Sequence, residues 1–546
     1  MHLDRATCYR ALHTRDRRFD GRFFTAVRTT GIYCRPICPA RPPKLENVTF
    51  YACAAAAEEA GFRACKRCRP ETAPGTPAWI GSAAVVARAL RLIGAGALDD
   101  DNAGGVDALA ARLGVGERQL RRLFEQHLGA APGAVARAQR LHFARALIDD
   151  TALPMGEIAY AAGYRSVRQF NHAMRASFAL APRDMRRAGG GTRRADALTI
   201  RLPYRPPFDW RALLAFLALR ATPGVESVGD GVYRRTLRVG DVAGWVEIRA
   251  VAGADALSVQ LRPADGSAAL AVVEATRRVA DLGADPHAIA SHLRADSALR
   301  PLIAARPGLR VPGAWDPFEL AVRGIVGQQV TVRGATTLVG RLVERCGERV
   351  DLAEDLTHLF PTPHVLASAD LTGIGMPGAR VTALQELARA VAEGRVQLDA
   401  ARGLDEVVAR LTALPGIGEW TAQYIAMRGL GEPDAFPHGD LVLRAALGNG
   451  AGPVSTKELS RAAEAWRPWR AYAAMHLWAG ASAGPASTAT DARRSRSSIK
   501  LAAASGSAVG AAAMVRQIKP RSGRMPRAQE KTSRGRAARA PGRSGR

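Results

Sequence analysis

The chain has 546 residues, a hydrophobic content of 47% and a formal net charge of +27. This length exceeds what one core accommodates, because domains usually have about 100–200 residues, so we expect roughly three to five domains. No strongly apolar run reaches the ~20 residues of a membrane span, and the N-terminus has no signal-peptide pattern, which favours a cytoplasmic protein. The excess of Lys and Arg predicts a polyanionic partner, unless the surface is merely basic.

Four cysteines near the N-terminus form two close pairs. Cys34 and Cys38 have the spacing C-x3-C, and Cys65 and Cys68 have the spacing C-x2-C. Thiols stay reduced in the cytosol, so such a cluster favours metal binding or catalysis over disulfides. Four thiolates in two pairs are typical of one tetrahedral Zn²⁺, and the spacing by itself favours a structural ion. The other cysteines stand alone and are interpreted as packing residues: Cys8, Cys53 and Cys346.

The residues around these cysteines change that preference. "GRFFTAVRTTGIYCRPICPAR" and "AGFRACKRCRP" resemble the N-terminal domain of the Ada family, which repairs methyl phosphotriesters in DNA. The resemblance covers roughly residues 1–75 and implies a zinc methyl-acceptor domain over 1–78. It implies that Cys34 takes the methyl group irreversibly and remains a zinc ligand, which suits a metal-bound thiolate. The nearby cations either hold the DNA backbone or offset the thiolate charge: Arg35, Lys66, Arg67 and Arg69.

Residues 82–188 contain a repeat. "LAARLGVGERQLRRLFEQHLGAAP" and "IAYAAGYRSVRQFNHAMRASFALAP" each place apolar residues at helical spacing on both sides of a glycine turn, which is typical of a helix-turn-helix. With the intervening "VARAQRLHFARALIDD", this segment resembles the AraC-type DNA-binding domain. The resemblance implies promoter DNA and RNA polymerase as partners. The candidate groove-facing residues, which read bases or only contact phosphates, are Arg118, Gln119, Arg121, Arg122, Ser166, Arg168, Gln169 and Asn171.

The second half of the chain begins after a glycine-rich linker at 189–195. Alternating segments such as "VYRRTLRVGDVAGWVEIRAV" predict strands, so we expect an antiparallel sheet-plus-helix domain over 196–308. From about Pro317 onward we expect helices only. The stretch "LTALPGIGEWTAQYIAMRGL" predicts a helix ending at Pro415 and another starting at Glu419, a helix-hairpin-helix whose turn binds DNA phosphate through its backbone. The turn residues are Gly416, Ile417 and Gly418.

"DAFPHGDLVLRAAL" follows the hairpin and carries Asp440. The hairpin, this Gly/Pro-rich segment and its aspartate resemble the helix-hairpin-helix DNA glycosylase superfamily. The neighbouring "WDPFELAVRGIVGQQVTV" and "WRPWRAYAAMHLWAG" extend the resemblance to AlkA-type methylpurine glycosylases over roughly 196–482, with the catalytic domain over 309–482. This implies hydrolytic excision of alkylated bases such as 3-methyladenine, with Asp440 stabilising the cationic sugar. Without the resemblance, the local sequence favours Asp440 as the cap of the helix "LVLRAAL".

The same resemblance implies a base pocket walled by Phe216, Trp420, Tyr424 and Trp478. Aromatic faces suit a cationic alkylated purine, although these side chains would also suit a hydrophobic core. Gln329 occupies the position that enters the gap left by the flipped base, where the family usually has leucine.

Absent residues narrow the chemistry further. No Lys lies between the hairpin and Asp440, which favours a monofunctional glycosylase, and no Pro-Cys-His-Arg motif is present, so we expect no direct alkylguanine repair. Residues 485–546 contain fifteen Lys and Arg against two acidic residues, a net +13, and are expected to be a disordered basic tail. We therefore expect a multidomain α+β protein that repairs alkylated DNA and regulates transcription. The alternative is a regulator whose glycosylase portion only binds DNA.

Overall fold

A computed structural model of the chain describes residues 4–70, 73, 84–99, 104–188, 197–239, 241–399, 401–448, 450 and 452–483. These residues belong to one compact unit, Met1–Gly484. The expected linker at 189–195 and the expected tail at 485–546 lie outside the described residues. None of the described helices is long and apolar enough to cross a membrane.

A small four-stranded sheet carries the N-terminal cysteines. Its strands have the order β3-β1-β2-β4, antiparallel except that β4 runs parallel to β2. Side chains alternate along β2, so Tyr33 is fully buried and anchors the strand, while Cys34 lies on the opposite face. The elements are α1 (Arg5–Thr14), β1 (Phe24–Val27), β2 (Ile32–Cys34), β3 (Val48–Tyr51), α2 (Ala54–Glu59) and β4 (Arg63–Ala64).

Two helix-turn-helix units follow, as predicted. The second helix of the first unit, α5, buries Leu120, Phe124 and Leu128 along one face, and α8 does the same in the second unit with Phe170, Met174 and Phe178. The long helix α6 lies between the units in the chain. The helices are α3 (Ala84–Gly94), α4 (Gly105–Leu113), α5 (Glu117–Leu128), α6 (Pro132–Asp150), α7 (Met155–Ala161), α8 (Val167–Phe178) and α9 (Pro182–Ala188).

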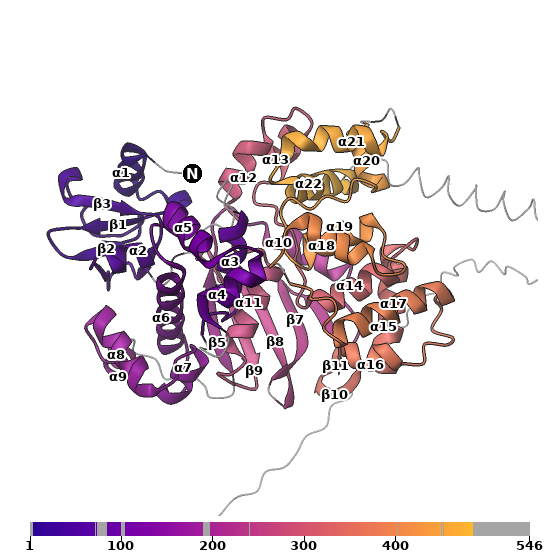
Figure 1. Ribbon diagram of the computed structural model, residues 1–546, viewed down its shortest axis with the longest axis horizontal. Coiled ribbons are helices and arrows are strands. Elements are labelled where there is room, and N and C mark those ends of the chain that lie inside the picture. Colours follow the sequence, from indigo (N-terminus) through magenta and orange to yellow (C-terminus); the bar gives the residue numbers. More distant parts are fainter. Residues whose placement is uncertain are drawn as a thin grey trace, which may run out of the picture. The chain divides into compact units, whose positions relative to one another are not determined.

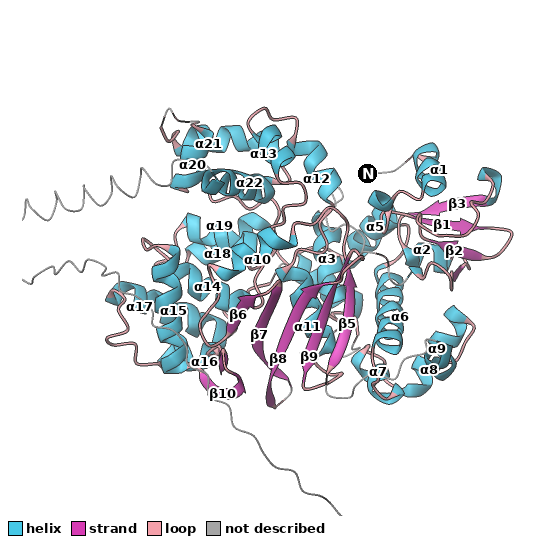
Figure 2. Ribbon diagram, turned by 180° about the vertical axis from the view of Figure 1, so that it is seen from behind, coloured by secondary structure: helices cyan, strands magenta, loops and turns pink. Residues whose placement is uncertain are grey.

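A five-stranded antiparallel sheet comes next, with the strand order β5-β9-β8-β7-β6 (Figure 2). Alternate residues of β9, Leu257, Val259 and Leu261, are buried on one face, where they share a core with Val272 and Val279 of α11. The elements are β5 (Leu198–Pro203), α10 (Trp210–Ala218), β6 (Glu226–Gly229), β7 (Val232–Val239), β8 (Val242–Ala250), β9 (Ala256–Arg262), α11 (Ala269–Val279), α12 (Pro286–Leu293) and α13 (Leu299–Ala305).

The remaining residues form a mostly helical domain (Figure 1), and its helices share a large apolar core. The helices are α14 (Pro317–Val326), α15 (Val332–Cys346), α16 (Pro363–Ser368), α17 (Gly378–Ala392), α18 (Leu404–Thr412), α19 (Glu419–Arg428), α20 (Leu441–Leu447), α21 (Thr456–Ala463) and α22 (Arg470–Ala483). The hairpin helix α18 ends at Thr412, three residues before the predicted Pro415, whereas α19 starts at Glu419 as predicted.

The prediction that this region contains only helices is wrong. Strands β10 (Glu348–Ala353) and β11 (Leu356–Leu359) form an antiparallel hairpin. The backbone N–H groups of Thr357 and His358 both donate to the carbonyl of Gly224, and the Thr236 hydroxyl donates to the carbonyl of His358. These partners lie more than a hundred residues away, so a tertiary contact that local periodicity does not reveal holds the hairpin in place.

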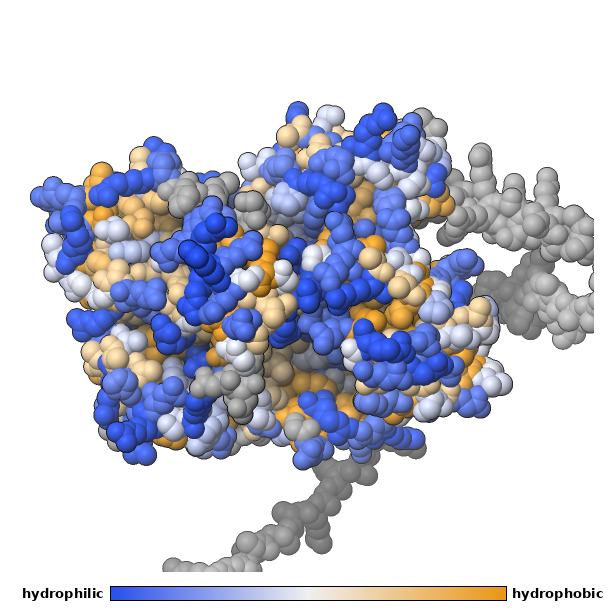
Figure 3. Space-filling model, in the orientation of Figure 1, coloured by the Kyte–Doolittle hydropathy of each residue, from blue (hydrophilic) through white to orange (hydrophobic). Residues whose placement is uncertain are grey.

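The multidomain α+β prediction is otherwise confirmed: a cysteine cluster, helix-turn-helix units, a sheet domain and a helical domain are all present. Apolar side chains gather in the cores, and hydrophilic side chains cover most of the face seen in Figure 3.

Candidate functional site

A large cavity collects side chains that are far apart in the sequence. Its volume is about 1050 Å³, enough for a nucleobase with its sugar. Residues of α10, α15, α19 and α22 line it, together with the loop before α15 and the start of α20. The five residues predicted for the base pocket and its chemistry all line this one cavity: Phe216, Trp420, Tyr424, Asp440 and Trp478.

Asp440 both caps a helix and faces the cavity. It is the N-cap of α20, where its Oδ1 accepts a hydrogen bond from the backbone N–H of Leu443 at 3.0 Å. The same oxygen accepts from the indole Nε1 of Trp478 at 3.1 Å, and Oδ2 accepts from the indole Nε1 of Trp420 at 3.2 Å. The two readings of the sequence are therefore compatible, because three donors fix the carboxylate in one orientation at the cavity wall.

The aromatic side chains offer flat faces to a ligand. The rings of Trp420 and Tyr424 are stacked, with centroids 5.2 Å apart and planes 9° from parallel. These two rings, Phe216 and Trp478 are all partly buried, rather than enclosed in the core. Stacking a base on such a face contributes about 1–3 kcal/mol.

The loop before α15 is tied to the hairpin turn. Gln329 is exposed at the cavity with a positive φ of 57°, a backbone conformation that few residues other than glycine adopt. Its neighbour Gln328 donates its side-chain amide to the carbonyl of Gly416 at 2.8 Å and to Thr421 Oγ1 at 3.2 Å. The sequence analysis missed Gln328. Its position beside Gln329 in a Gly-Gln-Gln run was the available signal.

Only part of the hairpin turn at residues 416–418 is exposed to solvent. Gly416 has a φ of 76°, and a Cβ there would lie 2.5 Å from the Cβ of Ala383, so glycine is required. Gly416 and Gly418 are exposed, whereas Ile417 is 4% exposed and packs into the core. The Ile417 side chain therefore anchors the turn, and contact with a phosphate falls to the backbone.

Exposed apolar side chains surround the cavity opening. Leu219 is 67% exposed and Leu441 is 52% exposed, unusual values for leucine. The apolar residues that are both exposed and cavity-lining are Leu219, Val330, Val332, Leu441 and Val442. A ligand that covers this rim would exclude water from the cavity.

A second site lies at the four cysteines. The Sγ atoms of Cys34, Cys38, Cys65 and Cys68 all lie within 4.8 Å of one another. Thiolates this close repel one another, and hydrogen bonds with the other three cysteines, first Cys38, raise the pKa of Cys34. A cation among the sulfurs would reverse that effect. An all-sulfur tetrahedral donor set fits Zn²⁺, so the cysteine cluster is a zinc site.

The structure separates the four cations around the cysteines into two pairs. Arg35 forms an ion pair with Asp20, and Arg69 forms one with Asp149, so these two are engaged within the protein. Lys66 and Arg67 are exposed and form no ion pair with a described residue. Arg35 and Arg69 are therefore paired with carboxylates, which leaves Lys66 and Arg67 as the cations beside the cluster that are open to DNA.

The predicted groove-facing residues lie on the second helix of each helix-turn-helix unit. Arg118, Gln119, Arg121 and Arg122 are exposed on α5, although Arg121 also pairs with Glu117 at 2.6 Å. On α8, Arg168 and Gln169 are exposed and Asn171 is half-buried. Ser166 is instead the N-cap of α8, with its Oγ accepting from the Gln169 N–H at 3.1 Å. Its side chain therefore caps the helix, and its contact with DNA stays a prediction.

Four protein-family models match successive parts of the chain. The metal binding domain of Ada matches residues 7–71 and a helix-turn-helix domain matches 109–188. The AlkA N-terminal domain matches 199–316, and the HhH-GPD superfamily of base excision DNA repair proteins matches 322–470.

Relatives match both halves of the chain. A protein of Mycobacterium tuberculosis named "Probable bifunctional transcriptional activator/DNA repair enzyme AlkA" is 45% identical over 484 residues, which cover 88% of this chain and 97% of the relative. DNA-3-methyladenine glycosylase 2 of Escherichia coli is 37% identical over 51% of this chain and 95% of its own length. The bifunctional activator and repair enzyme Ada of Escherichia coli is 39% identical over 25% of this chain and 38% of its own length.

Proposed function

The chain belongs to the family of AlkA-type bifunctional transcriptional activators and DNA repair enzymes, and we propose that it acts on alkylated DNA in two ways. Its C-terminal half hydrolyses the bond between an alkylated base, such as 3-methyladenine, and deoxyribose. Its N-terminal half accepts a methyl group from a methylated backbone phosphate and activates transcription in response.

The base-release reaction needs the base outside the duplex. Gln329 enters the gap in the stack, and the backbone of the turn at Gly416 and Gly418 holds a phosphate. The flipped base then stacks among Phe216, Trp420, Tyr424 and Trp478. As the bond breaks, Asp440 stabilises the positive charge that forms on the sugar, and water adds to that carbon. No Lys occurs in the hairpin or between it and Asp440 to form a Schiff base, so the strand stays intact.

The observation that carries this proposal is Asp440 in its cavity, with two indole N–H groups fixing the carboxylate. The test is incubation of the protein with duplex DNA containing 3-methyladenine, followed by chromatography of free bases. Release of the base and an alkali-labile, uncut strand supports a monofunctional glycosylase. A protein that binds this duplex and releases no base would instead be a regulator whose C-terminal half only binds DNA.

The methyl-transfer reaction uses the cysteine site. The sulfur of Cys34 attacks the methyl carbon of the phosphotriester, a sulfur–carbon bond forms, the carbon–oxygen bond breaks, and the phosphate leaves as a diester anion. Zn²⁺ bound by the four cysteines would keep the attacking sulfur deprotonated at neutral pH. Lys66 and Arg67 hold the phosphate near the sulfur because they are exposed beside the cluster.

Regulation follows from the charge that this reaction removes. Methylation converts one thiolate into a neutral thioether, so the domain repels DNA phosphates less. The helix-turn-helix units then hold promoter DNA more tightly through the side chains on α5 and α8, and RNA polymerase is recruited. These activities place the protein in the cytoplasm, at the nucleoid.

A further inference from the structure

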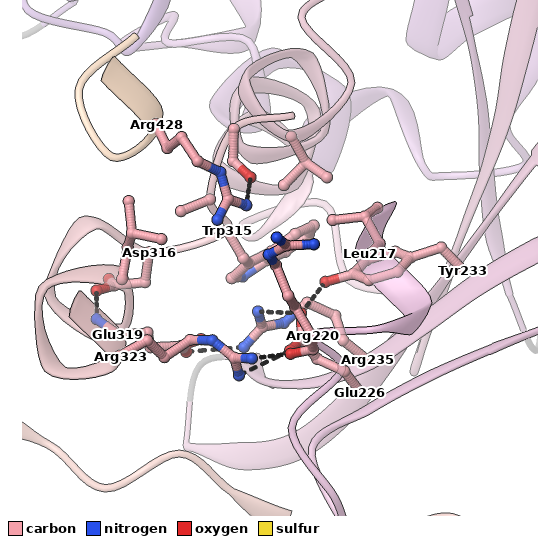
Figure 4. A pocket seen from close by; sticks show the side chains of 14 residues that line it. Leu217, Arg220, Glu226, Tyr233, Arg235, Trp315, Asp316, Glu319, Arg323 and Arg428 are labelled. Carbon is pink, nitrogen blue, oxygen red and sulfur yellow. Dashed lines mark hydrogen bonds and ion pairs between the residues drawn. The ribbon is translucent and has the colours of Figure 1, made fainter. Parts of the chain in front are cut away.

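Four arginines, Arg220, Arg235, Arg323 and Arg428, line a small cavity that adjoins the base cavity (Figure 4). Arg220 and Arg323 line the base cavity as well. Three acidic side chains, Glu226, Asp316 and Glu319, also line the small cavity, and two of them lie beside arginines. Arg235 pairs with Glu319 at 2.7 Å, and Arg323 lies 3.8 Å from Glu226.

The other two arginines form no ion pair with a described residue. Arg428 donates to the carbonyls of Pro312 and Gly313, at 2.7 and 3.3 Å, and to the hydroxyl oxygen of Tyr424 at 2.5 Å. Arg220 donates to the carbonyl of Phe216 at 3.2 Å. Because guanidinium groups stay protonated in proteins, Arg220 and Arg428 each carry a positive charge without a carboxylate partner among the described residues.

These charges lie directly against the predicted base-stacking residues. The guanidinium carbon of Arg220 is 3.7 Å from the ring centroid of Phe216, and that of Arg428 is 4.7 Å from the same ring. Burial alone would raise the pKa of Tyr424, but Arg428 and Arg220 hold it below its usual value. The base cavity therefore has a carboxylate, Asp440, in one part of its wall and a cationic group in another.

The polarity of this cavity matches the movement of charge in the proposed reaction. When the bond between sugar and base breaks, both electrons stay with the base nitrogen, so the base gains one negative charge and the sugar gains one positive charge. Water then adds to the sugar carbon and gives up a proton. A base that leaves as an anion takes up a proton from solvent, whereas a cationic alkylated base leaves as a neutral molecule and takes up none. A cation beside the base and an anion beside the sugar both favour the transition state over the ground state.

We propose that Arg220 is a catalytic residue that stabilises the departing base. This inference rests on the proposed glycosylase function and adds a second charged group to it. Arg220 is the group that reaches the base, because it lines the base cavity, whereas Arg428 lies behind it and holds Phe216 and Tyr424 in place. Positions four residues apart on α10 share a face of the helix, so Arg220, just beyond the end of α10, follows Phe216 toward the cavity.

The charge of the substrate base separates this role from a structural one. A neutral base such as hypoxanthine becomes negative as it leaves, so Arg220 attracts it only in the transition state. A cationic base such as 7-methylguanine becomes neutral, so Arg220 repels it most in the ground state. Removing the charge should therefore lower both kcat and kcat/KM for the neutral base, but lower kcat and KM together for the cationic base.

The experiment compares Arg220→Met with wild type on duplexes that contain hypoxanthine or 7-methylguanine. Met has no charge and its flexible chain packs against Phe216. We expect kcat/KM for hypoxanthine to fall at least tenfold, and by up to about 10²–10³-fold, as for loss of a transition-state donor. We expect kcat/KM for 7-methylguanine to stay the same or rise.

Two further variants complete the test. Arg220→Lys keeps the charge and should restore part of the hypoxanthine activity, which a packing defect would not allow. Arg211→Met makes the same substitution at an exposed position of α10 and should leave both substrates unaffected. Equal loss on both substrates, or no loss, would overturn the role of Arg220. A wild-type protein that releases neither base would overturn the glycosylase proposal itself.

Discussion

Replacing Asp440 with Asn changes the carboxylate while preserving most of its surroundings. Asn is as good an N-cap as Asp, so α20 should keep its start, with the amide oxygen accepting from the Leu443 N–H. The new amide N–H₂ then takes the place of Oδ2 and faces the indole N–H of Trp420, two donors against each other. One unmet hydrogen bond of this kind costs about 1–3 kcal/mol of stability, which a folded domain tolerates.

The expected effect on catalysis is larger. A unit charge about 4 Å from the developing sugar cation contributes about 4 kcal/mol at an effective dielectric constant near 20. Since each 1.36 kcal/mol is a factor of ten, we expect Asp440→Asn to slow base release about 10³-fold. Single-turnover release of 3-methyladenine from duplex DNA measures this directly, with DNA affinity measured in parallel.

A matched control is Asp209→Asn, since Asp209 is the N-cap of α10 and accepts from the Ala212 N–H at 2.9 Å. This variant loses one negative charge and keeps its cap, so release should stay near the wild-type rate. If Asp440→Asn releases base within tenfold of wild type, the carboxylate does not stabilise the transition state and the assigned mechanism is wrong.

Three further predictions concern other parts of the protein. Cys34→Ser should abolish methyl acceptance from methylated DNA, as read by peptide mass, whereas Cys346→Ser should leave it intact. Lys66→Ala and Arg67→Ala should each slow methyl transfer while the zinc content stays unchanged. Each should also reduce the slope of the logarithm of DNA affinity against the logarithm of salt concentration by about 1. An unchanged slope would show that these side chains do not contact phosphate. Burial raises the pKa of Glu319 from 4.5 to about 7, so between these pH values the folded protein holds a proton that the unfolded chain has released. The free energy of unfolding of the wild type should therefore fall as pH rises from 4.5 through 7, whereas Glu319→Gln has no such group and should gain up to about 3 kcal/mol over wild type between pH 4 and pH 8. Denaturant unfolding measures this difference, and a difference that stays constant with pH would contradict the shifted pKa.

Short sequence motifs allowed several sites and structural units of this protein to be predicted. The two cysteine pairs and the Leu-Pro-Gly-Ile-Gly turn are local patterns that predicted a metal site and a phosphate-binding turn, whereas Asp440 was predicted to be catalytic only through the resemblance of its segment to DNA glycosylases. The helical periodicity before and after Gly114 and Gly163 likewise predicted the two helix-turn-helix units.

Other features depend on contacts between distant segments. The β10–β11 hairpin is held by Gly224 and Thr236, so its own short, charged sequence gave no strand signal. The ion pairs of Arg35 and Arg69 could not be read from their spacing to the cysteines. Likewise, the lack of a described carboxylate partner for Arg220 and Arg428 depends on Glu226 and Glu319 lying beside arginines of other segments.

The most direct test of the account treats the protein with methylated duplex DNA and analyses one tube for both products. The peptide containing Cys34 is weighed by mass spectrometry, and free bases are separated from the same mixture. The account predicts one added methyl group on that peptide together with free 3-methyladenine. Methyl transfer without free base would contradict the glycosylase assignment, and free base without methyl transfer would reduce the zinc site to a structural role.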